Sequence, residues 1–249
     1  MCCRPGRRPL QFITHLDWNA VRQALYEVSG VSGIGKTHLL LRSAVEAMAL
    51  GTSVLWIDAT ASFSIARMVE MVRSHGNSMS LGDMLTRIHI VRCPNLNRYL
   101  SVLAAARANI LAAQHQQQLQ QRSGIYWTHL GLVIVDSIHA LVAPALAPST
   151  TGSDLGPLVS STLANATKEF GVDLDLAIVV TNLATTWRDV AKPALGYAWR
   201  FLVDERLVMD EWPSNLDAMT WPPPASRPRR ISSDKAQRDI PMPIKLIVQ

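Results

Sequence analysis

Short apolar runs alternate with longer stretches of helical periodicity along the middle of the chain. The runs are strand-sized and rich in β-branched residues, which is typical of buried parallel strands. The alternation predicts an α/β fold with a mostly parallel central sheet flanked by helices. The expected strands are Ala24–Val28, Ser53–Asp58, Arg87–Arg92, Leu132–Asp136, Leu176–Thr181, and a late pair near Trp199–Val203 and Arg206–Met209. The expected helices are Thr37–Leu50, Ser62–Ser74, Arg98–Gln120 and Asp154–Phe170.

Two segments depart from this alternation. Gln114–Gln121 is rich in Gln, and we expect it to extend an exposed helix before a loop. Residues 213–243 hold a Pro222–Pro224 run and several arginines, so they predict a mostly irregular tail, after which Ile244–Val248 is a candidate edge strand. The chain is therefore expected to consist of a short basic N-terminal segment (1–23), a core (24–212) and a Pro/Arg-rich C-terminal tail (213–249).

Composition fits a packed intracellular protein. Of 249 residues, 48% are hydrophobic and 17% are charged, a balance that excludes wholesale disorder. No apolar run is long enough for a membrane span, and no apolar region follows the basic N-terminus as in a secretory signal. The cysteines, Cys2, Cys3 and Cys93, provide neither a disulfide framework nor zinc-ligand spacing. The net charge of +5 comes from the two ends, which either attract nucleic acid or are merely solvated.

One phosphate-binding motif occurs in the chain. Gly30–Thr37 reads Gly-Val-Ser-Gly-Ile-Gly-Lys-Thr, a full match to G-x-x-x-x-G-K-[ST] between an expected strand and an expected helix. Its glycines let successive N–H groups turn toward phosphate oxygens, and its Lys can reach the β and γ phosphates. The predicted nucleotide-binding residues are Gly30, Val31, Ser32, Gly33, Ile34, Gly35, Lys36, Thr37 and, through its backbone N–H, His38.

Besides the loop, a strand that ends in an acidic residue supports nucleotide binding. The apolar run Leu132–Val135 ends in Asp136. At the carboxyl end of a parallel strand beside the loop, this carboxylate can hold Mg²⁺ through water, while the Thr37 hydroxyl coordinates it. A hydrophobic run ending in Asp is common by itself, but together with the loop it favours a P-loop NTPase. We therefore predict that ATP and Mg²⁺ bind, with Thr37 and Asp136 as the metal site.

The order and spacing of these motifs resemble the RecA recombinase superfamily. The closer likeness is to the eukaryotic paralogues of the strand-exchange recombinase, in particular the D-type paralogues. It spans roughly residues 24–210 and is most specific at Lys192–Gly196, after the Val-Val-Thr-Asn of residues 179–182. The other matching segments are Ala24–Val28, Val54–Asp58, Arg87–Val91 and Leu132–Ile138.

The resemblance implies a RecA-like, ATP-binding core that acts in homologous recombination repair in the nucleus. It implies assembly with other recombinase paralogues and binding of single-stranded or branched DNA through loops near Ala143–Gly156 and Leu183–Gly196. In the second loop, Trp187 is a candidate for base stacking and Arg188 and Lys192 are candidates for phosphate contacts. Packing of Trp187 against a partner or its own sheet is an equally open interpretation. The first loop carries no Lys or Arg and is a poor phosphate contact.

Two departures from the family pattern predict slow hydrolysis with nucleotide binding retained. Alignment on Ile57-Asp58 places Thr60 where active recombinases carry a catalytic Glu, and a hydroxyl is no base near neutral pH. Leu183 stands where the family has a Gln that senses the γ-phosphate. Asp58 is a candidate substitute base, but a carboxylate near Mg²⁺ or a hydrogen-bonded structural group is the preferred interpretation. The expected activity is a weak, DNA-dependent ATPase without a clear catalytic residue.

Two other functions fit less well. A non-hydrolysing structural adaptor that bridges other recombinase paralogues agrees with the residues at 60 and 183, although the complete loop argues against a vestigial site. A small-molecule kinase built on the same loop would need an Arg-bearing lid, and none is evident. Paralogues of the family usually carry a small N-terminal helical domain, whereas about 23 residues precede the first expected strand here, so that either the N-terminus is short by nature or the chain is incomplete. Among these residues, Phe12, Ile13, Leu16 and Trp18 either bind a partner or cover the sheet edge.

Overall fold

The structure is a computed structural model, and it describes most of the expected core. The described residues are 23–76, 79–118, 125–146, 156–187, 190–195, 199, 201–211 and 244–248. The N-terminal segment before residue 23 and the tail from 212 to 243 lie outside this part of the chain. Of the first expected DNA-facing loop, Ala143–Gly156, residues 147–155 also lie outside it, whereas residues 143–146 end one helix and Gly156 begins the next, so the predicted loop was too long at both ends.

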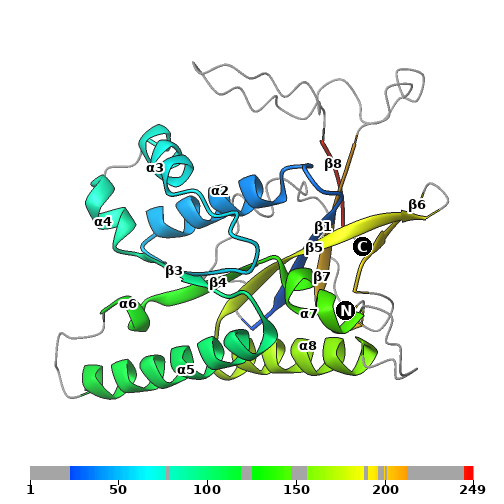
Figure 1. Ribbon diagram of the computed structural model, residues 1–249. Coiled ribbons are helices and arrows are strands. Elements are labelled where there is room, and N and C mark those ends of the chain that lie inside the picture. The colour runs from blue at the N-terminus through cyan, green and yellow to red at the C-terminus, as the bar shows by residue number, and fades with distance from the viewer. Residues whose placement is uncertain are drawn as a thin grey trace, which may run out of the picture.

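A twisted parallel sheet forms the centre of the molecule (Figure 1). Its strands lie in the order β3-β2-β4-β5-β1-β7, and every neighbouring pair in that order is parallel. Strand β8 pairs antiparallel with β7, and β6 pairs antiparallel with the far end of β5. The strand bounds are β1 Leu25–Gly30, β2 Ser53–Asp58, β3 Ile88–Arg92, β4 Leu130–Asp136, β5 Ala177–Trp187, β6 Val190–Pro193, β7 Glu205–Glu211 and β8 Ile244–Val248.

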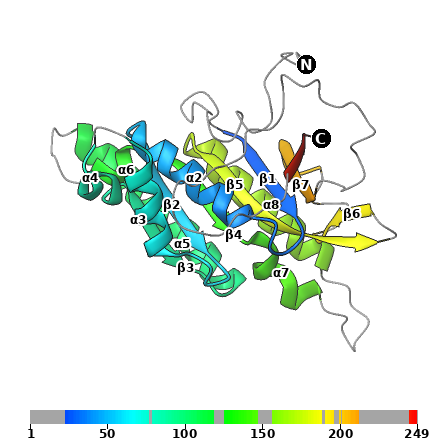
Figure 2. The ribbon, with the colours of Figure 1, turned by 90° about the horizontal axis from the view of Figure 1, so that it is seen from above.

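Helices cover both faces of the sheet, as Figures 1 and 2 show. Helices α2 (Lys36–Ala49), α3 (Ile65–Ser74) and α4 (Leu81–Leu85) pack on one face. Helices α5 (Leu96–Gln118), α7 (Ile138–Leu146) and α8 (Gly156–Asp173) pack on the other, and α6 (Ile125–Thr128) is a short turn before β4.

Both faces of the central strands are apolar, which explains why these strands read as continuous hydrophobic runs. In β4, Leu132 and Ile134 face α2, whereas Val133 and Val135 face α5, α7 and α8. The predicted α/β fold with a mostly parallel sheet flanked by helices is confirmed. Among the described residues, no helix combines the length and apolar character needed to cross a bilayer.

Most of the expected elements occur, and the edge strand Ile244–Val248 is confirmed as β8. The prediction of a strand near Trp199–Val203 is wrong. Trp199 is fully buried and Phe201 begins a turn in which the N–H of Leu202 donates to the Trp199 carbonyl at 3.1 Å. An alternation of large apolar residues suggested a strand there, but β7 begins only at Glu205, after Asp204 has accepted the N–H of Leu25 at 2.8 Å.

The second expected DNA-facing loop is largely a hairpin instead. Strand β5 continues through residues 183–187 and pairs with β6, so that Ala184 lies opposite Pro193 and Trp187 opposite Val190. The β-branched residues Thr185 and Thr186 favour this extension. The hairpin projects beyond the rest of the sheet (Figure 1).

Candidate nucleotide-binding site

The turn from β1 into α2 is made by glycines with left-handed backbone conformations. Gly33 has φ 83° and Gly35 has φ 103°, values that residues with a Cβ seldom adopt. Gly35 is also the N-cap of α2, so no side chain accepts a hydrogen bond from the first N–H groups of this helix, and its first turn contains no acidic residue. The positive end of the helix is therefore suited to an anion.

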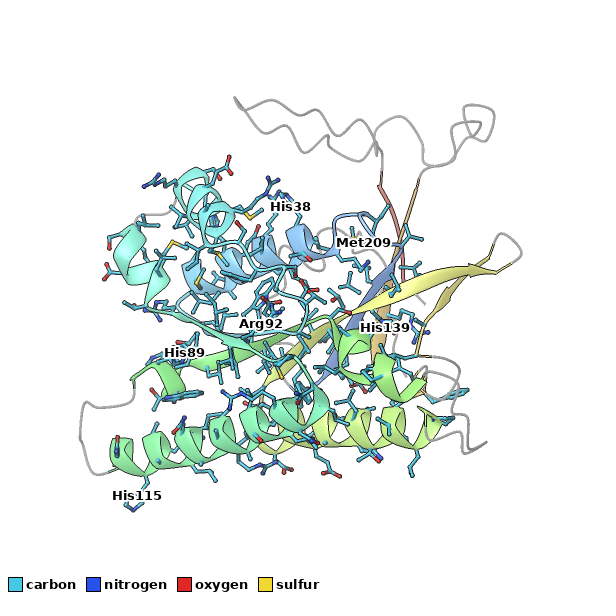
Figure 3. All side chains as sticks on the ribbon, viewed as in Figure 1. His38, His89, Arg92, His115, His139 and Met209 are labelled. Carbon is cyan, nitrogen blue, oxygen red and sulfur yellow. The ribbon has the colours of Figure 1, made fainter. Side chains whose placement is uncertain are left out.

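Gly30 is required at the end of β1 for a different reason. A Cβ at this position would lie 2.7 Å from the carbonyl oxygen of Met209 on β7 and 3.0 Å from a side-chain carbon of Ile34. The glycine thus lets β1 and β7 approach closely just where the loop leaves the sheet (Figure 3, Met209).

Lys36 is folded back over the loop. Its Nζ donates to the carbonyl oxygens of Gly30 at 2.7 Å and Val31 at 2.8 Å. Burial lowers the pKa of Lys36, and the negative charge of Asp136 opposes that change. These contacts hold a cationic group beside the backbone that is expected to surround phosphate.

The structure brings the two predicted metal residues together. Asp136 ends β4 with 3% of its surface exposed, and the Thr37 hydroxyl donates to its Oδ2 at 2.7 Å. Thr181 on β5 donates to the other oxygen, Oδ1, at 2.5 Å, and Ser62 donates to Oδ2 at 3.1 Å. A hydroxyl and a carboxylate are oxygen ligands of the kind that Mg²⁺ binds, so these side chains fit the metal. No cluster of three or more His, Cys, Asp and Glu side chains suited to a metal occurs in the described part of the chain.

Asp58 is engaged by the backbone of the segment that follows β2. Its carboxylate accepts the N–H groups of Thr60 at 3.2 Å, Ser62 at 3.1 Å and Phe63 at 3.4 Å. Arg92, at the end of β3, lies 3.4 Å from the same carboxylate. Of the roles considered for Asp58, this arrangement supports the hydrogen-bonded structural group over the substitute base. Thr60, which the resemblance is expected to align with a catalytic Glu, donates its hydroxyl to Ser62 Oγ at 2.9 Å.

His38 has a side-chain partner that sequence reasoning missed. The residue lies on α2 close to the loop, on the side toward α3 (Figure 3), and its Nδ1 is 3.3 Å from a guanidinium nitrogen of Arg67. Burial, and then the positive charges of Arg67 and Arg42, lower the pKa of His38, while Glu70 opposes the change. A neutral imidazole can accept a hydrogen bond from Arg67, so the pair is compatible with near-neutral pH.

The candidate DNA contacts are only partly placed. Trp187 ends β5, and Lys192 lies on β6 opposite Thr185, but their side chains and the whole of Arg188 lie outside the described residues. Leu183 lies on β5, where its carbonyl accepts the N–H of Ala194 at 2.7 Å. The structure therefore describes the backbone of strands β5 and β6, to which Trp187 and Lys192 belong, but not the predicted side-chain contacts with DNA.

Strand order and loop placement define the class of protein. The phosphate-binding loop joins β1 to α2 in the middle of the sheet. Strand β4 ends there at Asp136, and β5 passes the end of β1, with Leu183 paired with Gly30, before it extends into the hairpin. The chain thus contains an α/β, RecA-like core of the P-loop type.

Sequence comparison agrees with this class. The chain is 32% identical to DNA repair protein RAD51 homolog 4 of Bos taurus over 210 residues, which is 83% of this chain and 61% of that protein. It is also 32% identical to the Mus musculus protein of the same name over 199 residues, 78% of this chain and 57% of that one. The chain thus spans about three fifths of each relative. No family model matches it. Together, the fold and the sequence similarity support the interpretation that the chain is related to the RAD51/RecA family.

Proposed function

We propose that the chain is a D-type recombinase paralogue that binds ATP and Mg²⁺ and serves as an accessory factor in homologous recombination repair in the nucleus. The observation that carries the proposal is the contact between Thr37 and Asp136 at the mouth of a complete phosphate-binding loop. The similarity to two proteins named for DNA repair supports the biological setting. Residues 24–212 would form the nucleotide-binding core, with basic flanks at 1–23 and 213–249.

The loop provides separate groups for each part of the ligand. Backbone N–H groups of residues 31–38 would bind phosphate oxygens, and Lys36 would place a positive charge on the β and γ phosphates. Thr37 directly, and Asp136 through water, would hold Mg²⁺, which when bound neutralises phosphate charge. The contacts of Lys36 with Gly30 and Val31 keep its amine within the loop, ready to turn to phosphate.

Hydrolysis is proposed to be slow. Thr60 has no basic group, Leu183 has no polar atom in its side chain, and Asp58 is occupied by three N–H groups of its own chain. ATP would therefore persist in the site and favour one conformation of the loop and its surroundings. A partner or DNA that prefers this conformation would then bind more tightly when ATP is present.

DNA contact is proposed for the β5–β6 hairpin. The hairpin begins directly after Thr181 and Asn182, so that one strand joins the Asp136 contact to the projecting tip. Trp187 would stack on a base of single-stranded or branched DNA, and Arg188 and Lys192 would meet phosphates.

A non-hydrolysing adaptor that bridges other recombinase paralogues is the second candidate function. The occupied Asp58 carboxylate and the hydroxyl at Thr60 favour it, because neither provides a base. In that case, the complex would form without any need for ATP.

Lys36→Ala separates these functions. Loss of the ammonium group removes charge-assisted hydrogen bonds of about 1.5–3 kcal/mol each, so ATP affinity should fall about ten- to a hundredfold. The measurement is ATP binding by calorimetry together with co-purification of co-expressed recombinase paralogues. If ATP binding controls assembly, both decline together. Lys168→Ala is the matched control, because Lys168 pairs with Asp204 at 2.7 Å, away from the loop, and should retain both properties. If a Lys36→Ala protein no longer binds ATP but still co-purifies fully with the other paralogues, ATP binding does not control assembly. The non-hydrolysing adaptor is then the function that remains.

A further inference from the structure

Asp136 is the acceptor of three side-chain hydroxyls, only one of which belongs to the phosphate-binding loop. Thr37 comes from that loop, Thr181 from β5, and Ser62 from residues 59–64, here called the β2–α3 segment. We propose that Ser62 and Thr181 are positioning residues for Mg²⁺, and that the β2–α3 segment supports the metal-binding carboxylate instead of carrying a catalytic base. The inference rests on the proposed binding of ATP and Mg²⁺ at this site.

Thr181 fixes the inner side of the carboxylate. It is completely buried on β5, the neighbour of β4, and its hydroxyl binds Oδ1 of Asp136 at 2.5 Å. Because a carboxylate with one oxygen bound in this way cannot rotate freely, the other oxygen, Oδ2, is directed toward Thr37 at 2.7 Å. The carboxylate is thus oriented before a metal arrives, which reduces the ordering needed on binding.

Ser62 supports the outer side. Its hydroxyl donates to Oδ2 at 3.1 Å and in turn accepts a hydrogen bond from the Thr60 hydroxyl at 2.9 Å. A hydroxyl that is already accepting a hydrogen bond is polarised to donate more strongly. The residue at the position of the family's Glu therefore acts, through Ser62, on the metal-binding carboxylate.

The β2–α3 segment is itself held in place on both sides. Asp58 accepts three of its N–H groups, and the N–H of Ala59 donates to the backbone carbonyl of Asp136 at 2.7 Å. Arg92 of β3 approaches Asp58, and Ala61 within the segment has a left-handed φ of 60°. A non-glycine residue persists in that conformation only where surrounding contacts impose it. Ser62 is therefore presented to Asp136 by a defined backbone rather than by a free loop.

The test is the Mg²⁺ dependence of ATP binding by the full chain. ATP affinity is measured by calorimetry over a series of Mg²⁺ concentrations and in EDTA, for the wild type, Ser62→Ala, Ser62→Thr and Thr181→Val. Ser64→Ala is the matched control, because Ser64 lies in the same segment and caps α3 through the N–H of Arg67 without touching Asp136. Since Ser62 is exposed, Ser62→Ala folds more readily than a variant of buried Thr181 and is the primary test.

We expect Ser62→Ala to raise the Mg²⁺ concentration at which the increase in ATP affinity is half-maximal by about three- to tenfold, the range for the net contribution of one ordinary hydrogen bond. Affinity in EDTA should change less than about twofold, because the hydroxyl acts only through the carboxylate. Ser62→Thr and Ser64→Ala should match the wild type. An unchanged Mg²⁺ midpoint in Ser62→Ala, or an equal shift in Ser64→Ala, overturns the inference while leaving ATP binding intact. A wild type that ignores ATP at every Mg²⁺ concentration instead overturns the proposed function, and the inference with it.

Discussion

Gly30 shows how a motif residue can be fixed by packing as well as by its ligand. The closest atoms to a Cβ at this position belong to Met209 on β7 and to Ile34 of the loop. The first glycine of the motif therefore joins the loop to the sheet, while Gly33 and Gly35 shape the turn by their positive φ values.

Gly30→Ala should destabilise the protein by about 1–3 kcal/mol, the usual effect of overpacking. The added methyl group would lie 2.7 Å from the backbone oxygen of Met209, and a backbone atom cannot move aside as a flexible side chain can. The free energy of unfolding is measured by urea denaturation.

Gly82→Ala provides the comparison for Gly30→Ala. Gly82 lies in α4, and its added Cβ would find no atom closer than the Ser80 hydroxyl oxygen at 3.8 Å. This substitution should be neutral or stabilise the protein by up to about 1 kcal/mol. Equal stability of the two variants would contradict the close approach of β1 and β7.

At the residue scale, the sequence identifies only part of the site. The loop from Gly30 to Thr37 was predictable because its members are adjacent, and Asp136 because it ends an apolar strand. Ser62 and Thr181 were not predictable as its partners, because they lie 74 and 45 positions from Asp136 and carry no motif of their own. Only the folded sheet brings these hydroxyls together.

At the scale of elements, β1 and β7 are joined by a buried ion pair. Glu27 on β1 is completely buried and bonds Arg206 on β7, and it also accepts a hydrogen bond from Asn182 of β5 at 2.6 Å. Burial raises the pKa of Glu27, and the positive charge of Arg206 opposes that change. The pair therefore links three adjacent strands on the face opposite α2.

Glu27→Gln should destabilise the protein by about 3–5 kcal/mol, because it leaves the buried guanidinium of Arg206 without a counter-charge. Chemical denaturation followed by circular dichroism measures the change. Glu205→Gln is the matched control: Glu205 lies on β7 but is partly exposed, so its substitution should stay within about 0.5 kcal/mol of wild type. Wild-type stability of the Glu27→Gln protein would show that the pair is not needed to join β1 to β7.

The elements that sequence periodicity misjudged lie where tertiary contacts decide the backbone. The apolar alternation of Trp199, Phe201 and Val203 suggested a strand, yet Trp199 is buried under the sheet and Phe201 is 67% exposed. Strand β5 was expected to stop at Thr181, but pairing with β6 extends it to Trp187. Helices α4, α6 and α7 were not predicted. Helices α4 and α6 are too short to show a helical period, and α7 has Pro144 inside it, a residue that is typical of helix ends and loops.

At the scale of the whole molecule, the strand order explains why distant motifs act as one site. In the order β3-β2-β4-β5-β1-β7, the carboxyl ends of β4 and β1 lie on either side of β5 in the middle of the sheet, next to Thr181–Leu183 of that strand. Binding residues in parallel α/β folds lie at these ends. Alternation of strands and helices predicted the parallel sheet, but the order of its strands required the structure.

The central claim is that this core binds ATP firmly and hydrolyses it slowly. The most direct measurement titrates the wild-type chain with Mg·ATP, with and without single-stranded DNA, and follows binding and phosphate release in the same samples. The account predicts saturable ATP binding with phosphate release far below the roughly 10 s⁻¹ typical of enzymes, even when DNA is present. Failure to bind ATP, or brisk phosphate release stimulated by DNA, would contradict it.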